Sequence, residues 1–85
     1  MEKKILKNTI KKLIIKQFKV KKKEIQKNLN ADNVARWDSL GHLTLISILE
    51  KKFKISFKQD EVVKMLSEKE IYSMIIKKIL KENSY

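Results

Sequence analysis

Apolar residues recur every three to five positions over residues 3–18, and lysines fill most of the positions between them. This spacing places the apolar side chains on one face of an α-helix and the charged side chains on the other. The sequence therefore predicts an amphipathic first helix over 3–18, and its buried face is predicted to consist of Ile5, Leu6, Ile10, Leu13, Ile14 and Phe18.

A second helical pattern begins at the pair Asp38-Ser39 and predicts a helix over about residues 39–53. Aspartate and serine both favour the start of a helix, because their side chains can accept a hydrogen bond from its unpaired backbone N–H groups. The apolar face of this helix is predicted to hold Leu40, Leu43, Ile46, Leu49 and Phe53, widened by Leu45 and Ile48.

Residues 19–37, between these two helices, lose the helical periodicity. Lysines crowd the first part of this segment, and the second part contains Asn and Asp, which compete with the helical backbone for hydrogen bonds. The sequence predicts a long loop with at most a short turn near Ile25 and Leu29. Structureless loops longer than about 12 residues tend to be functional.

Three shorter patterns complete the chain. Ile55 and Phe57 alternate with polar residues, but a lone strand would have no partner, so an extended connector is expected. Residues 60–66 predict a short third helix that buries Val62, Val63, Met65 and Leu66. Ser67 with Glu70 forms a capping-box pattern that opens a final helix, and its core face is predicted to consist of Ile71, Ile75, Ile76, Ile79 and Leu80.

The predicted fold is therefore all-α, with four helices in a single domain over residues 1–85. A chain of 85 residues is too short for a second core, and its lack of proline and single glycine argue against a turn-rich β-protein.

The residue types bearing on catalysis and metal binding are few. Cysteine is absent and there is one histidine, so neither a disulfide framework nor a zinc site is expected. No Ser-His-Asp set, glycine-rich phosphate loop or evident carboxylate pair is present, so the chain is not expected to be an enzyme. His42 is predicted to lie on the surface, and Trp37 is predicted to close the core.

The longest apolar run near the N-terminus has three residues, too few for a signal core, and a cytoplasmic location is expected.

The positive charge of the chain is concentrated in its first third. The net charge is +11, and residues 1–27 contain 11 lysines and two glutamates, whereas residues 38–70 are neutral. Clustered lysines attract phosphate, which leaves open a different function: a small basic helical domain that binds nucleic acid or an anionic membrane surface. Only one of the 21 basic residues is an arginine, however, and lysine, isoleucine and asparagine are enriched together, as a coding bias would also produce.

The stretch from Trp37 to about Leu80 resembles the acyl and peptidyl carrier proteins. "DSLGHLTLISILEKKFKISF" and "DEVVKML" follow each other in the order and spacing typical of that family. The N-terminal helix and the loop after it agree with the family in type but not in recognisable residues. The resemblance implies a four-helix bundle of the acyl-carrier type, with a long loop between the first two helices and a short third helix. It also implies a stand-alone, monomeric carrier rather than an enzyme.

Ser39 matches the serine that, in this family, carries a 4'-phosphopantetheine arm. The resemblance implies that a phosphopantetheinyl transferase attaches the arm from coenzyme A with magnesium, and that its thiol holds an acyl or aminoacyl thioester. The cargo would pass from a loading enzyme to an acyltransferase or synthase, and its identity is left open. Asp38 would help to present Ser39 to the transferase, and Leu40 would contact the arm and partner enzymes. The residues alone also allow Asp38 or Ser39 simply to cap the helix and Leu40 to pack in the core.

One stripe of the second helix is predicted to face partner proteins beside Ser39. Its members recur at intervals of three or four residues: Gly41, Thr44, Ile48 and Lys51. The main fatty-acid carriers of that family fill much of this stripe with acidic residues, whereas Glu50 is the only carboxylate within residues 39–53 here. The stretch "WDSLGHL" looks more like the carriers of specialised pathways. Electrostatic complementarity governs encounter rates and the rejection of wrong partners. The sequence thus predicts a poor substrate for fatty-acid enzymes and a partner with an apolar or acidic docking face.

Overall fold

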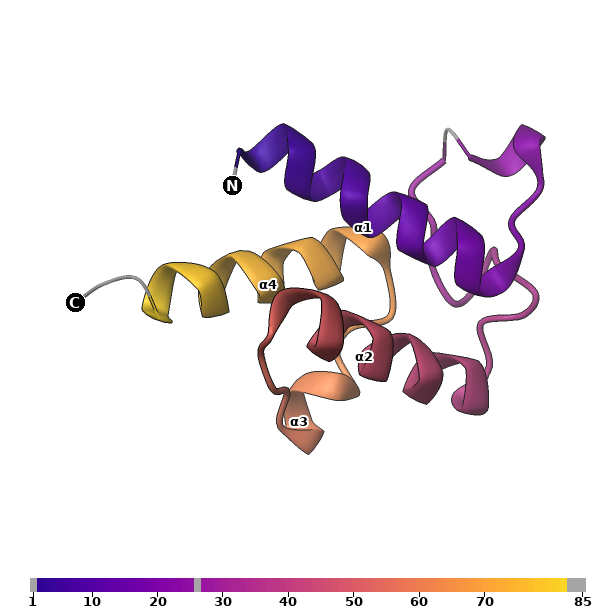
Figure 1. Cartoon of the computed structure of the whole chain (residues 1–85). Coiled ribbons are helices and arrows are strands. Elements are labelled where there is room, and N and C mark those ends of the chain that lie inside the picture. Colours follow the sequence, from indigo (N-terminus) through magenta and orange to yellow (C-terminus); the bar gives the residue numbers. More distant parts are fainter. Residues whose placement is uncertain (1, 26, 83–85) are drawn as a thin grey trace.

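The computed structural model of the chain describes residues 2–25 and 27–82 and contains four α-helices (Figure 1). These are α1 (Lys3–Phe18), α2 (Ser39–Phe53), α3 (Gln59–Val62) and α4 (Glu68–Glu82), and a short 3-10 helix η1 (Lys22–Glu24) lies in the loop after α1. Within this described part, the β-pairing is confined to one isolated antiparallel bridge between Asn30 and Ser67. The all-α prediction and the bounds of the first two helices are confirmed.

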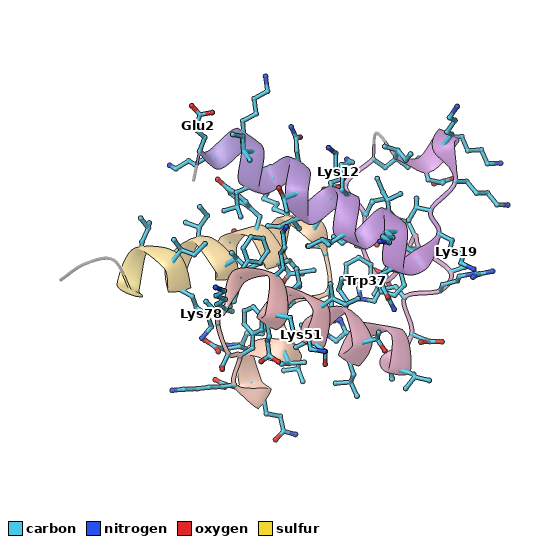
Figure 2. The ribbon with its side chains drawn as sticks, viewed as in Figure 1. Glu2, Lys12, Lys19, Trp37, Lys51 and Lys78 are labelled. Atoms are coloured by element: carbon cyan, nitrogen blue, oxygen red, sulfur yellow. The ribbon has the colours of Figure 1, made fainter. Side chains whose placement is uncertain are left out.

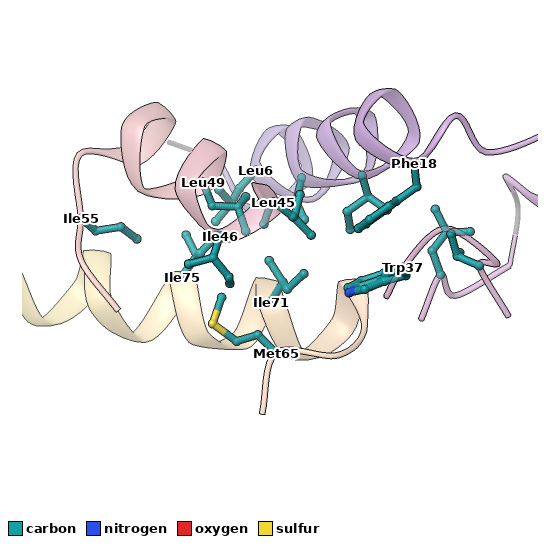
Figure 3. Close-up of a cluster of buried hydrophobic side chains, with 14 residues drawn as sticks. Leu6, Phe18, Trp37, Leu45, Ile46, Leu49, Ile55, Met65, Ile71 and Ile75 are labelled. Carbon is teal, nitrogen blue, oxygen red and sulfur yellow. The ribbon is translucent and has the colours of Figure 1, made fainter. Parts of the chain in front are cut away.

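The three long helices enclose the core, with α1 packed against both α2 and α4 (Figure 1). The loop after α1 runs past the end of that helix and returns to the start of α2, and the one-turn helix α3 lies beyond α2. The buried apolar side chains form one cluster (Figure 3): Leu6, Ile10, Ile14, Phe18, Leu29, Val34, Trp37, Leu45, Ile46, Leu49, Ile55, Met65, Ile71 and Ile75. Each of the three long helices contributes to this core.

The predicted apolar face of α2 is confirmed in part and wrong for Leu40 and Leu43. Leu45 is fully buried, together with Ile46 and Leu49, whereas Leu40 is 76% exposed and Leu43 is 57% exposed. Apolar residues surround most of this helix, so periodicity alone does not decide which side packs against α1 and α4. The prediction for α1 holds for four residues, but Ile5 is exposed and Leu13 is only half-buried.

The third predicted helix is shorter than expected, and two of its apolar residues are not buried. The chain leaves the helix after Val62, and only Met65 of the four expected side chains is fully buried. Val63 is 60% exposed and Leu66 is 43% exposed. A helix of one turn presents too small a face to bury four side chains. In α4, Ile71 and Ile75 are buried as predicted, Ile76 and Ile79 are half-buried, and Leu80 is exposed.

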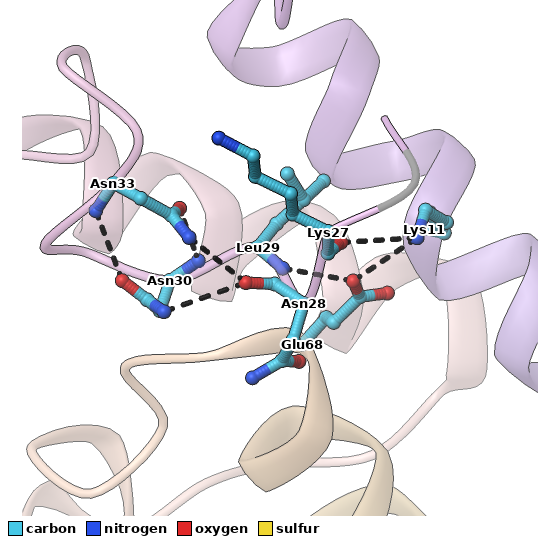
Figure 4. Close-up of polar contacts among 7 residues, drawn as sticks. All are labelled: Lys11, Lys27, Asn28, Leu29, Asn30, Asn33 and Glu68. Atoms are coloured by element: carbon cyan, nitrogen blue, oxygen red, sulfur yellow. Dashed lines mark hydrogen bonds and ion pairs between the residues drawn. The ribbon is translucent and has the colours of Figure 1, made fainter. Parts of the chain in front are cut away.

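The loop between α1 and α2 is anchored at Leu29, which is fully buried (Figure 4). The Leu29 N–H donates to Glu68 Oε1 at 2.9 Å, and the Glu68 N–H donates to the Leu29 carbonyl at 2.7 Å. Lys11 Nζ lies 3.2 Å from the same Glu68 oxygen, which ties α1 to the start of α4. The predicted turn near Ile25 is confirmed as η1, and the capping of α4 by Ser67 is confirmed by the Glu70 N–H, which donates to Ser67 Oγ at 3.0 Å.

Two lysines end helices in the left-handed conformation, and this costs stability. Lys19 after α1 and Lys54 after α2 have φ values of 51° and 55°. Because glycine adopts this conformation without steric penalty, Lys19→Gly and Lys54→Gly are each expected to raise the free energy of unfolding by roughly 0.5–1 kcal/mol. Urea denaturation measures the effect. The matched control is Lys16→Gly, at an exposed position inside α1, which should lower stability by about 1 kcal/mol; a gain there would contradict the explanation.

Candidate functional site

The start of α2 is held by Asp38. This residue has extended backbone geometry, and its Oδ1 accepts the Gly41 N–H at 2.8 Å, which caps the helix. Ser39 is the first residue of α2 and is exposed. The structure therefore assigns the capping role to Asp38, and the Ser39 hydroxyl is not needed for it. The backbone N–H groups at this end and the positive end of the helix dipole favour an anionic group there.

An open groove of about 580 Å³ runs from Ser39 between α2 and α3. Its lining is mostly apolar: Ala31, Trp37, Asp38, Ser39, His42, Leu43, Val62, Val63 and Leu66. The residues incorrectly predicted to be core, Leu43, Val63 and Leu66, lie on its walls. Leu40, next to Ser39, is also exposed, so of the two roles that the sequence left open for it, packing in the core is wrong. The surface beside Ser39 is consequently apolar and accessible.

His42 is buried, which overturns its predicted surface position. Its Nδ1 accepts the indole N–H of Trp37 at 3.0 Å, and its Nε2 lies 2.8 Å from the Val62 carbonyl oxygen. The only tautomer that satisfies both contacts is the neutral ring with its proton on Nε2. Both ring nitrogens thus have partners, with Nε2 tying α2 to α3 and Nδ1 tying α2 to Trp37, and the ring serves as a structural link.

Trp37 continues this link towards α1. Its ring is stacked on Phe18, with centroids 5.0 Å apart and an angle of 19° between the ring planes (Figure 3). Trp37 is 4% exposed, which confirms the prediction that it closes the core. The end of α1 is therefore joined to α3 by a chain of contacts on either side of Ser39 in the sequence: Phe18, Trp37, His42 and Val62.

Glu61 fixes the other side of α3. Its Oε1 accepts the Lys58 N–H at 2.8 Å and lies 2.8 Å from Lys78 Nζ on α4. The Lys58 N–H, followed by the Lys78 ammonium group, holds the pKa of Glu61 below its ordinary value. These contacts position the helix that carries one wall of the groove.

The lowered pKa of Glu61 predicts a pH dependence of stability. A carboxylate whose folded pKa is below its unfolded value of about 4.3 stabilises the protein above that pH, and the contribution is lost as pH falls through the folded pKa. Because Glu61 is partly exposed, we expect Glu61→Gln to lower the free energy of unfolding by a few tenths of a kcal/mol at neutral pH and to reduce its decline on acidification. Thermal melts from neutral to acidic pH measure this. The exposed neighbour Asp60, changed to Asn, is the control; equal effects of both variants would contradict the assignment.

The predicted docking stripe of α2 differs at its first residue. Thr44 and Lys51 are exposed and Ile48 is half-buried, but a Cβ atom on Gly41 would lie 2.8 Å from both the Arg36 carbonyl oxygen and Phe18 Cε1. Gly41 therefore offers no outward side-chain position, and its predicted place in the exposed stripe is corrected.

Several charged residues outside the groove have structural contacts. Glu50 Oε2 accepts the Phe57 N–H at 2.9 Å, so the one carboxylate of α2 holds the connector to α3. Lys7 lies over the ring of Tyr72, 5.0 Å from its centroid, and Lys11 pairs with Glu68. Part of the basic charge of α1 thus stabilises its packing against α4.

Sequence reasoning missed two features of this region. Glu68 satisfies a buried loop N–H, and the only sequence signal for this role is an acidic residue in the first turn of α4. The groove between α2 and α3 was also missed, because the residues on its walls were interpreted as core. No group of three or more histidine, aspartate and glutamate side chains suited to a metal ion occurs in the described part of the chain.

No family model matches the chain, and a comparison with curated proteins finds no match. None of the helices within the described ranges combines the length and the apolar character that a membrane crossing requires.

Proposed function

We propose that the chain is a carrier protein that holds an acyl or aminoacyl group as a thioester on a 4'-phosphopantetheine arm attached to Ser39. The observation that carries the proposal is an exposed serine at the first position of a helix that Asp38 already caps, at the mouth of an apolar groove. The order of the helices, with a long loop before α2 and a one-turn α3, supports a bundle of the acyl-carrier type.

The residues around Ser39 fit the size and chemistry of such an arm. A phosphodiester on Ser39 would be near the positive end of α2, where backbone N–H groups favour an anion. The groove of about 580 Å³ has room for an extended chain, and its apolar wall suits methyl and methylene groups. When attached, the arm would supply a terminal thiol that holds the cargo.

Three residues have distinct roles in this proposal. Ser39 provides the hydroxyl oxygen that would attack the β-phosphorus of coenzyme A in the transferase. A phosphodiester to phosphopantetheine would form, the pyrophosphate bond would break, and adenosine 3',5'-bisphosphate and the hydroxyl proton would be released. Asp38 fixes the first turn of α2, so that the serine is presented in one orientation. Leu40, which is mostly exposed, provides apolar contact area for the transferase, the loading enzyme and the acyltransferase or synthase.

Intact-protein mass spectrometry tests the proposal. The full chain is incubated with coenzyme A, magnesium and each of several broad-specificity phosphopantetheinyl transferases. The expected result is the addition of one arm per chain, located on Ser39 by fragmentation. Failure of all the transferases to modify the protein, under conditions in which they modify a known carrier, would contradict the proposed function.

A further inference from the structure

A second groove, of about 300 Å³, lies where α1 ends, and four cationic side chains line it. These are Lys19, Lys21, Lys23 and Arg36, and the only acidic lining residue is Glu24, whose Oε2 lies 3.2 Å from Lys27 Nζ. Within the described ranges, none of the four cations forms an ion pair with a carboxylate. Their charge is therefore available to a ligand. We call this region the basic groove.

The basic groove is close to Ser39. Phe18 and Arg36, which both line it, meet at Gly41: the Arg36 carbonyl oxygen and Phe18 Cε1 are each 2.8 Å from the position of a Cβ on that glycine. Gly41 is two residues after Ser39 in the first turn of α2. Lys19 and Trp37 lie at the same end of the bundle (Figure 2). A partner that reaches Ser39 would therefore also come near the basic groove.

We propose that the basic groove docks a carboxylate-rich segment of the partner enzyme that acts at Ser39. This inference rests on the proposed carrier function and names the chemistry of the partner. The predicted docking stripe of α2 offers little to attract a basic enzyme. Glu50, the one carboxylate of this helix, accepts the Phe57 N–H, and Lys51 is positive. Apart from the carboxylate of Asp38, which caps α2, the charge beside Ser39 is dominated by the four cations of the basic groove, so steering would require an acidic partner surface.

The shape of the basic groove favours a protein over a membrane or a nucleic acid. It is a short concavity with Phe18, Val20 and Val34 among its lining residues, which suits a segment that carries both apolar and acidic side chains. A membrane surface is broad and would make contact mainly with the outward lysines of α1. Specific readers of nucleic acid favour the bidentate contacts of arginine to bases and phosphates, and the chain has one arginine, Arg36.

Binding of an oligoglutamate peptide to the full chain tests the proposal, with an oligoglutamine peptide as the uncharged reference. The groove variant carries Lys19→Gln, Lys21→Gln, Lys23→Gln and Arg36→Gln. A matched control variant loses the same charge at exposed positions elsewhere: Lys3→Gln, Lys4→Gln, Lys52→Gln and Lys64→Gln. Trp37 is the only tryptophan, and it lies between the two grooves: it lines the groove beside Ser39 and is stacked on Phe18, which lines the basic groove. Its fluorescence detects binding at this end of the bundle, and the groove variant shows whether that binding is at the basic groove.

The groove variant is expected to lose roughly tenfold or more in affinity for oligoglutamate, and the control variant less than about threefold. Equal losses in the two variants would overturn the proposal, because binding would then follow net charge alone. Tighter groove-dependent binding of duplex DNA or phosphatidylserine vesicles would also overturn it. Attachment of the arm to Ser39 is measured separately by mass in both variants. Loss of groove-specific peptide binding with normal arm attachment refutes only the docking inference, whereas absence of arm attachment in the wild type refutes the carrier function.

Discussion

Ser39→Ala is expected to abolish attachment of the 4'-phosphopantetheine arm completely. Alanine removes the hydroxyl that would form the phosphodiester, and no other group at this position can replace it. The fold should remain intact, because Asp38 caps α2 and alanine is favourable inside a helix. Circular dichroism and urea denaturation should therefore show a stability close to that of the wild type, while intact mass shows no added arm.

Ser47→Ala is the matched control for this experiment. Ser47 is an exposed serine on the same helix, but it lies in the interior of α2 rather than at its start. It should be modified neither in the wild type nor in the Ser39→Ala variant, and its loss should leave arm attachment unchanged. If the Ser39→Ala variant still gains an arm, or if the Ser47→Ala variant gains none, attachment at the start of α2 would be contradicted.

The sequence predicted the bounds of α1 and α2 well because its local signals agreed there. Lysines alternate with apolar residues along α1, and Asp38 supplies a helix-start signal that the structure confirms in its contact with Gly41. Which side of α2 is buried was predicted less well. Leu40 and Leu43 have the same spacing as the residues that are buried, and only the packing of α1 and α4 against Leu45 decides between the faces.

The sequence predicted the helix start that contains Asp38 and Ser39 but not the groove beside it. Asp38 and Ser39 stand where the sequence placed them, whereas the groove depends on α3 ending after one turn, which leaves Val63 and Leu66 outside the core. His42, like Leu43, was assigned to the wrong side of α2, because the spacing of residues does not show which side is buried. Its burial depends on partners distant in sequence, because the Val62 carbonyl lies 20 positions away.

Trp37→Ala is expected to lower the free energy of unfolding by about 3–5 kcal/mol, which is the usual cost of removing a buried aromatic side chain. In a domain of this size that loss is a large part of the total stability and should lower the melting temperature by roughly 15 °C or more. The variant loses the stacking on Phe18 and leaves His42 Nδ1 without its donor. Thermal denaturation followed by far-ultraviolet circular dichroism measures the shift.

Trp37→Phe and His42→Leu separate packing from hydrogen bonding within this prediction. Phenylalanine can keep the stacking on Phe18 but cannot donate to His42, and leucine leaves both the indole N–H and the Val62 carbonyl without their partner. Each single variant should cost about 1–3 kcal/mol, since an unsatisfied buried polar group carries its full desolvation penalty. The double variant should cost less than the sum of the two, because the indole N–H that His42→Leu leaves unpaired is absent from it. Strict additivity would show that Trp37 and His42 form no hydrogen bond in solution, which would contradict this explanation.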